Sequence, residues 1–162
     1  MLSYKLNNSV IYYHLILFIS FCVSVNYFIE LKYLNIFFYV FFHLTFIYLT
    51  FYYHNISLYF ASFFYGILFD LFLVNYIGPH LIVFLLFLSL IFFIKKFLII
   101  YSSNRISIII LFLLFFILFL EMFIAQIAFN YSFKFETFII FCVIGLFSIV
   151  PCFYFFKRLD NL

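Results

Sequence analysis

The feature that most constrains this chain is a long stretch that carries almost no charge. Between Lys32 and Lys95, Asp70 is the only Asp, Glu, Lys or Arg. Hydrophobic residues make up 71% of the 162 residues, and charged residues only 8%. A soluble domain has roughly 25% charged residues. The sequence therefore predicts an integral membrane protein and excludes a water-soluble fold.

The length of the apolar segments decides between helices and a barrel. Only these two structures satisfy all backbone hydrogen bonds inside lipid. Barrel strands alternate apolar and polar residues, whereas these segments are apolar on all sides and long enough for helices. We predict an all-α bundle of about six transmembrane helices, forming one domain over residues 1–162. The expected segments are Val10–Ile29, Leu34–Tyr53, Ser57–Leu73, His80–Ile100, Ile106–Phe129 and Phe138–Phe156.

The gap between the second and third segments is only a few polar residues wide, so five helices are the alternative.

Orientation follows from the basic residues, which favour cytoplasmic loops. If the N-terminus is inside, only Lys32 and Lys134 face outward. Both ends are then cytoplasmic. The basic residues on that side are Lys5, Lys95, Lys96, Arg105, Lys157 and Arg158.

The formal net charge of +3 fits basic anchors beside anionic membrane lipid, and it does not indicate nucleic acid binding. The cysteines form no CxxC pair, and the histidines have no metal-ligand spacing. We expect His14 and His43 to be satisfied inside the bundle. The sequence contains no nucleotide-binding loop and no hydrolase motif. We therefore predict no enzyme activity, no cofactor and no metal.

Asp70 is the first candidate functional residue. Ser62, Gly66 and Asp70 are four residues apart, about one helical turn each, so one helix stripe carries them. A carboxylate in hydrocarbon costs about 2.5–3.5 kcal/mol on insertion scales, so we expect this stripe to face the bundle. Small residues there let a neighbouring helix approach closely. The stripe could fix helix register or receive a partner; alternatively, Asp70 is a capped structural residue near the outer face.

The turn after Asp70 is the second candidate. It faces outward in the predicted topology, and its residues are Asn75, Gly78, Pro79 and His80. We expect the neighbours of Asp70 to come from His80, the Ser62 hydroxyl and the backbone N–H groups around Gly78. His80 could instead be an interfacial histidine at a helix start, and its position favours that interpretation.

Glu121 is the third candidate, because it lies in the outer half of the fifth segment, as Asp70 does in the third. Two carboxylates at similar depth could share a proton, or one could be neutral. Glu121 could also face solvent or lipid headgroups, but we favour a structural role.

In the sixth segment, Pro151 removes a backbone hydrogen bond and predicts a kink.

The stretch that begins at Gly66 resembles the MreD family of rod shape-determining proteins. That family has Gly, three apolar residues and Asp, then a turn Gly eight residues after the Asp and a polar residue two further on. Gly66, Asp70, Gly78 and His80 fall in that register. The family also often ends in a proline, apolar residues and a basic tail, which "VPCFYFFKRL" matches with Pro151, Lys157 and Arg158. The turn differs, since Pro79 is displaced from the family's usual position.

The resemblance implies a non-enzymatic subunit of the cell-elongation machinery in the bacterial cytoplasmic (inner) membrane. Its partner would be an MreC-like single-span protein, with the MreB filament, the RodA glycosyltransferase and the elongation transpeptidase nearby. Its role would be in lateral peptidoglycan synthesis. The family also resembles the six-helix substrate-binding subunits of vitamin transporters, and a small-solute transporter subunit is therefore the alternative. Such a subunit would need an enclosed pocket with convergent polar groups.

Overall fold

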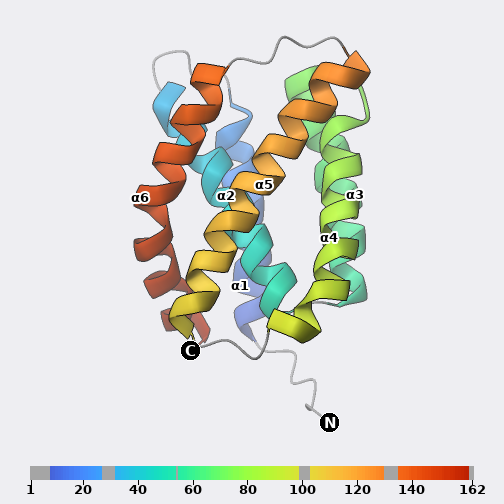
Figure 1. Ribbon diagram of the computed structural model, residues 1–162. Coiled ribbons are helices and arrows are strands. Elements are labelled where there is room, and N and C mark those ends of the chain that lie inside the picture. Colours follow the sequence, from blue (N-terminus) through green and yellow to red (C-terminus); the bar gives the residue numbers. More distant parts are fainter. Residues whose placement is uncertain (1–7, 27–31, 54, 99–102, 130–134, 161–162) are drawn as a thin grey trace.

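The computed structural model describes residues 8–26, 32–53, 55–98, 103–129 and 135–160, and nearly all of them are helical (Figure 1). These residues form six α-helices that run up and down in a bundle. Their bounds are α1 Asn8–Ser24, α2 Lys32–Tyr52, α3 Ile56–Phe69, α4 Pro79–Leu98, α5 Ser103–Phe129 and α6 Phe135–Asp160. A π-helical turn, η2 at Asp70–Val74, continues α3.

The six predicted segments correspond to these six helices, so the five-helix alternative is wrong. Two local contacts separate α2 from α3 although the connection is short. The backbone N–H of Tyr53 donates to the carbonyl of Leu49 and closes the last turn of α2. Asn55 then caps α3 in an extended conformation, and its side chain accepts the N–H of Leu58. An asparagine cap of this kind satisfies a donor that a helix start otherwise leaves unpaired.

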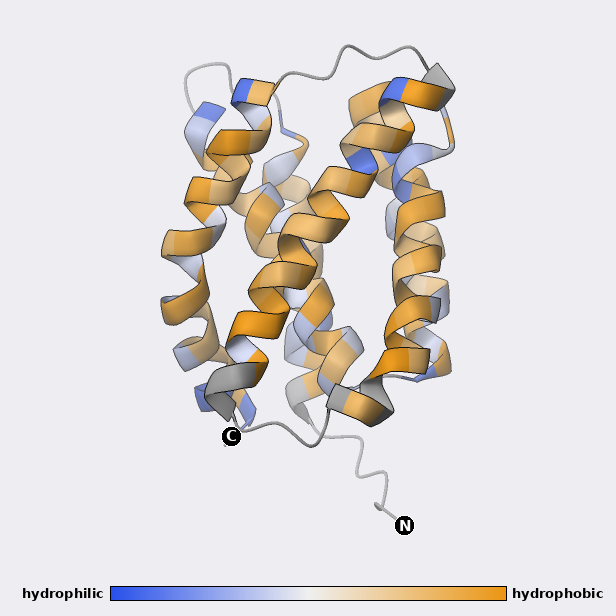
Figure 2. Ribbon diagram, in the orientation of Figure 1, coloured by the Kyte–Doolittle hydropathy of each residue, from blue (hydrophilic) through white to orange (hydrophobic). Residues whose placement is uncertain are grey.

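Four stretches of the described residues are long and apolar enough to cross a membrane: Lys32–Tyr52, Ile56–Val74, Ile106–Ile127 and Phe135–Asp160. Val10–Ser24 and Pro79–Ile94 are apolar but shorter. Figure 2 shows hydrophobic residues along the length of every helix, with hydrophilic residues gathered mostly toward the two ends. Large apolar side chains are exposed on the outer faces, among them Phe60, Phe112 and Phe147. Such a surface suits a helix bundle in lipid.

Helix α2 is the centre of the bundle, because it packs against α1, α4, α5 and α6. Its C-terminal half is buried almost all round, from Val40 to Phe51. Its two threonines, Thr45 and Thr50, donate to the carbonyls one turn earlier and so need no partner from another helix. Ser62 of α3 does the same toward Leu58. The predicted contact between Ser62 and Asp70 is therefore wrong.

A cluster of tyrosines joins the two ends of the chain at one end of the bundle. The hydroxyls of Tyr13 and Tyr53 donate to Asp160 Oδ1, at 2.8 and 2.6 Å, and that of Tyr48 donates to Oδ2. These contacts tie the last turn of α6 to α1 and α2. Helix α1 therefore begins on the same side of the bundle where α6 ends, as the predicted topology requires.

Gly66 allows α3 and α4 to approach closely, as the sequence predicts for a small residue on this stripe. A Cβ atom at this position would lie only 2.6 Å from the Cα of Leu81. Ser62, Gly66 and Asp70 are all buried, which confirms that the stripe faces the bundle. The neighbouring backbone belongs to α4 of the same chain. The interpretation of this stripe as a surface that receives a partner is therefore wrong.

Gly66→Ala should lower the stability of the protein by about 1–3 kcal/mol, because the new methyl group meets a backbone atom that cannot move aside cheaply. Gly145→Ala is a matched control, since its Cβ would meet the flexible end of Leu114 instead, at 2.8 Å from Cδ2. Thermal unfolding in detergent, followed by circular dichroism, compares the two variants. Equal unfolding temperatures would contradict the close approach of α3 to α4.

Candidate functional site

The candidate site begins where α3 changes into the π-helical turn. The N–H of Asp70 lies within hydrogen-bonding reach of both the Gly66 and Ile67 carbonyls, at the point where the helix widens. The turn ends at Asn75, which has a left-handed backbone conformation with φ of 61°. Asparagine adopts this conformation more readily than most residues. Together these features direct the Asp70 carboxylate toward the start of α4.

The Asp70 carboxylate caps α4 from a distance of several residues. Its Oδ2 accepts the backbone N–H groups of Gly78, at 2.7 Å, and Leu81, at 3.2 Å, and its Oδ1 accepts that of His80, at 2.8 Å. Pro79, the first residue of α4, has no N–H to satisfy. The N–H of Ile82 already donates to the Gly78 carbonyl, at 2.9 Å. Every backbone donor in the first turn of α4 is thus paired.

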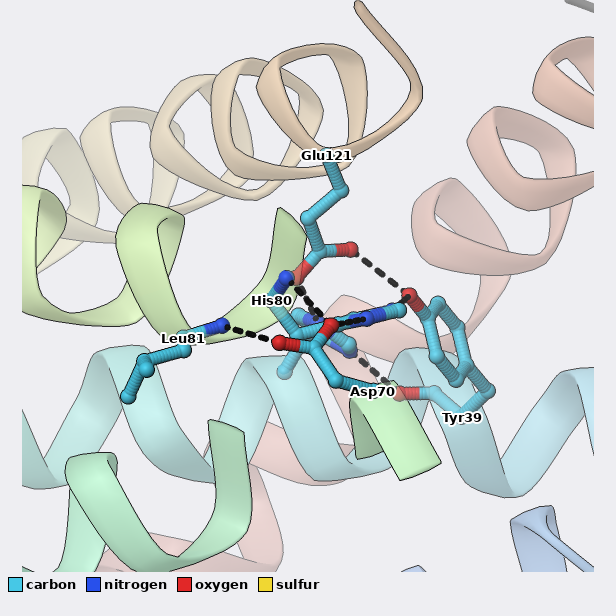
Figure 3. Close-up of polar contacts among 6 residues, drawn as sticks. Tyr39, Asp70, His80, Leu81 and Glu121 are labelled. Carbon is cyan, nitrogen blue, oxygen red and sulfur yellow. Dashed lines mark hydrogen bonds and ion pairs between the residues drawn. The ribbon is translucent and has the colours of Figure 1, made fainter. Parts of the chain in front are cut away.

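Asp70 is also the first member of a chain of side chains that joins η2 to three helices, α4, α2 and α5 (Figure 3). Its Oδ1 lies 2.8 Å from Nδ1 of His80, and Nε2 of His80 lies 3.1 Å from the hydroxyl of Tyr39 in α2. That hydroxyl donates to Oε2 of Glu121 in α5, at 2.6 Å. Glu121 Oε1 contacts Nε2 of His43 at 2.8 Å, and Nδ1 of His43 lies 2.7 Å from the Tyr39 carbonyl. We call these five residues the polar network.

Four of the five members of the polar network are buried, and Tyr39 is partly exposed. Asp70 and His43 are 0% exposed, Glu121 is 4% exposed and His80 is 6% exposed. Aromatic rings surround it. The ring of Phe69 stacks on His80 with centroids 5.5 Å apart, and Phe141 stacks on Tyr39 at 5.3 Å. In so apolar a setting, an unpaired polar atom would be costly, so the pairing within the network decides whether this core is stable.

The contacts of the polar network give a proton count if each of the five contacts holds one proton. The Tyr39 carbonyl cannot donate, so Nδ1 of His43 carries one of the five. Without any of these protons, each of the five side chains would carry one negative charge. On this count the network is neutral overall, whichever atom of each pair holds the proton. Neutrality removes the large cost of burying a net charge.

The proton count permits three arrangements in which Asp70 stays a carboxylate. In the first, both histidines are charged and Glu121 is ionised. In the second, Glu121 holds the proton that it shares with His43, and in the third it holds the one shared with Tyr39, which then donates to His80. All three satisfy every nitrogen and carboxylate oxygen. On both sides the network ends on backbone groups, at the Tyr39 carbonyl and at the N–H groups beside Asp70.

The structure brings together some of the predicted site residues and leaves others apart. Asp70 meets His80 and Gly78, as expected, and the cap on α4 confirms that Asp70 is a capped structural residue. His80 stands at a helix start, as predicted, and its side chain is buried beside Asp70. Glu121 is buried rather than turned to solvent or headgroups. The buried, paired His43 is confirmed as a satisfied bundle histidine.

The other predicted residues that the structure describes are not members of the polar network. Asn75 is exposed and Pro79 is buried at the start of α4. Pro151 is exposed within α6, which continues to Asp160, and Lys157 and Arg158 are exposed in its last turn. Lys95, Lys96 and Arg105 lie on α4 and α5, but their side chains are outside the described part of the chain. Lys5 and Lys134 are outside it entirely.

Sequence reasoning missed Tyr39 as a member of the network and Asp160 as an acceptor of tyrosines. Tyr39 and His43 are four residues apart on α2, so their shared helix face was a signal that could have found the pair. Among the residues that the structure describes, no group of three or more His, Cys, Asp or Glu is arranged to hold a metal ion. Comparison with protein-family models, curated proteins and solved structures finds no match to this chain.

Asp70→Asn should destabilise the protein by about 2–3 kcal/mol, because a carboxamide offers one acceptor oxygen where three backbone N–H groups and a histidine need two. Asp160→Asn is the matched control. Its partners are hydroxyls, which can accept as well as donate, so the amide can be satisfied. Denaturant unfolding in detergent measures both. If Asp160→Asn lowers the free energy of unfolding as much as Asp70→Asn does, the cap on α4 is not the reason for the effect of Asp70→Asn.

Glu121→Gln should be tolerated, with a change below about 1 kcal/mol, because each orientation of the amide reproduces one neutral arrangement of the network. Glu121→Met has a similar size but cannot hydrogen bond, and we expect it to cost about 2–3 kcal/mol by leaving Tyr39 and His43 unpaired. The same unfolding assay compares them. If the pair were a simple buried salt bridge, Glu121→Gln would cost about 3–5 kcal/mol instead, and the proton count would be wrong.

Proposed function

We propose that this protein is a non-enzymatic scaffold subunit in the membrane of a bacterium, acting with an MreC-like single-span partner in the cell-elongation machinery. The observation that carries the proposal concerns the four residues of the resemblance to the MreD family. Gly66, Asp70, Gly78 and His80 form one contact unit, in which Gly66 admits α4 and Asp70 caps it. The four residues that match the family pattern thus act together at one contact, the packing of α3 against the start of α4.

The buried polar groups are already paired within the protein, and this supports a scaffold rather than a solute carrier. Every carboxylate oxygen and ring nitrogen of Asp70, His80, Glu121 and His43 contacts another group of the protein. A substrate-binding subunit would hold some of its polar groups open toward a ligand. A closed network instead gives a rigid bundle on which partners can assemble.

In this proposal the protein lies in the cytoplasmic (inner) membrane with all six helices spanning it. Both ends of the chain are cytoplasmic, with Lys157 and Arg158 at that face. The polar network then lies toward the outer face, close to the side where wall synthesis occurs. The MreB filament would be met on the inner side, and the RodA glycosyltransferase and the elongation transpeptidase within the membrane and outside it.

The proposal is tested by depletion and by purification from native membranes in mild detergent. Depletion should turn rod-shaped cells round, and an MreC-like protein should co-purify. Complementation with Gly145→Ala should restore rods, whereas Asp70→Asn should fail because the start of α4 loses one of its two acceptor oxygens. Cells that keep their shape on depletion but lose uptake of a vitamin would overturn the proposal in favour of the transporter alternative.

A further inference from the structure

Helix α6 presents an apolar face to the outside of the bundle. Its most exposed side chains are Phe147 at 80%, Val150 at 74% and Tyr154 at 73%, and Pro151 between them is exposed as well. We call these four residues the α6 face. Helices α2 and α5 pack against the other side of α6, which lies at one edge of the bundle in Figure 1. The α6 face therefore meets whatever surrounds the protein.

One backbone acceptor on the α6 face lacks the donor that a helix normally provides. Pro151 has no N–H, so the carbonyl of Phe147, four residues earlier, does not receive the bond that closes a helical turn. Among the residues that the structure describes, no side chain donates to this carbonyl instead. Since Phe147 and Pro151 are both exposed, the carbonyl between them lies on the outer side of the helix.

The depth of this carbonyl makes the missing donor costly. Phe147 is at the middle of the 26 residues of α6, about 18–20 Å from either end. Helix α6 is long and apolar enough to cross a membrane, so its middle lies where water is absent. Lipid chains cannot donate a hydrogen bond, and an unsatisfied backbone group in hydrocarbon costs several kcal/mol. A donor from another protein chain removes that cost.

A groove beside the carbonyl suits the packing of a second helix. Its volume is about 240 Å³, and Ile149, Val150, Phe153 and Tyr154 of α6 line most of it. The remaining lining residues, Ser107 and Lys157, already interact within the chain. The open part of the groove is therefore mainly apolar. It can receive an apolar side chain from a helix that also reaches the Phe147 carbonyl.

A second copy of this chain does not supply the missing donor along α6. Two copies have the same orientation in the membrane, so a two-fold pair brings positions of equal depth together. The large exposed side chains of α6 between Ile139 and Phe155 are apolar except for Tyr154. Tyr154 is seven residues from Phe147, about 10 Å along the helix, which is too far for its hydroxyl to reach the carbonyl of the other copy. The donor therefore belongs to a different chain.

We propose that the α6 face binds the transmembrane helix of a partner that carries a hydroxyl or carboxamide side chain at the middle of the membrane. This side chain donates to the Phe147 carbonyl, and an apolar side chain of the same helix enters the groove. Hydrogen bonds of this kind join helices inside membranes. The inference rests on the proposed function, in which the helix is that of the MreC-like single-span protein, and it adds the face on which that helix binds.

Photo-crosslinking in native membranes tests the position of the partner. Benzoyl-phenylalanine replaces Phe147 or, as the matched control, Phe64, which is 58% exposed near the middle of the stretch Ile56–Val74. Figure 1 shows α3 on the side of the bundle away from α6. With a tagged MreC-like protein, irradiation should join the two chains at Phe147 and not at Phe64.

The other outcomes separate this inference from the proposed function. If the MreC-like protein co-purifies but joins Phe64 or neither position, the α6 face is overturned and the proposed function stands. If it does not co-purify at all, the proposed function fails and the inference fails with it. A product with twice the mass of this chain, formed at Phe147, would show that a second copy covers the α6 face and would overturn the inference.

Pro151→Ala tests the hydrogen bond, because alanine returns the N–H and pairs the Phe147 carbonyl within α6. It should reduce the co-purified MreC-like protein about threefold, the effect of one hydrogen bond between membrane helices, without lowering the unfolding temperature. Val143→Ala is the matched control, since Val143 is exposed on α6 two turns away from the carbonyl, and it should reduce the partner less. No loss in Pro151→Ala, or equal losses in both variants, would overturn the role of the carbonyl.

Discussion

The hydrogen bonds that Asp70 accepts at the start of α4 hold the rest of the bundle in place. Inside lipid, water is not present to satisfy the first N–H groups of a helix, so another part of the protein has to do so. Asp70 satisfies the N–H groups of His80 and Leu81 and that of Gly78 just before the helix, and it also binds the His80 ring. With the start of α4 fixed, His80 faces α2, and through Tyr39 the contact reaches Glu121 in α5.

Three carboxylates that the structure describes, the buried Asp70 and Glu121 and the partly exposed Asp160, are held by different kinds of partner, and the partners decide how each one behaves. Asp70 faces backbone donors, which cannot reverse their role. Glu121 lies between a phenol and an imidazole, which can exchange roles by moving protons. Asp160 accepts freely rotating hydroxyls. The requirement for a full carboxylate is therefore strict at Asp70 and weaker at the other two positions.

Much of the fold and part of the site could be predicted from the sequence. The absence of charge and the segment lengths predicted six helices, because both properties act locally along the chain. The stripe of Ser62, Gly66 and Asp70 could also be assigned to one face, since helical periodicity fixes it. The partners of Glu121 could not be predicted, because nothing local indicates which helices meet. The tyrosines on Asp160 were missed for the same reason: the polar atoms come from three helices that are distant in sequence.

The central position of α2 has a consequence for the order in which the protein assembles. Two of its polar side chains pair with residues that are synthesised much later. His43 pairs with Glu121, which is 78 positions on, and Tyr48 pairs with Asp160, which is 112 positions on. Synthesis proceeds from the N-terminus, so α2 is complete before α5 and α6 exist. The hydrogen bonds of His43 and Tyr48 can therefore form only after α5 and α6 have been synthesised, so the core around α2 is completed by the last part of the chain.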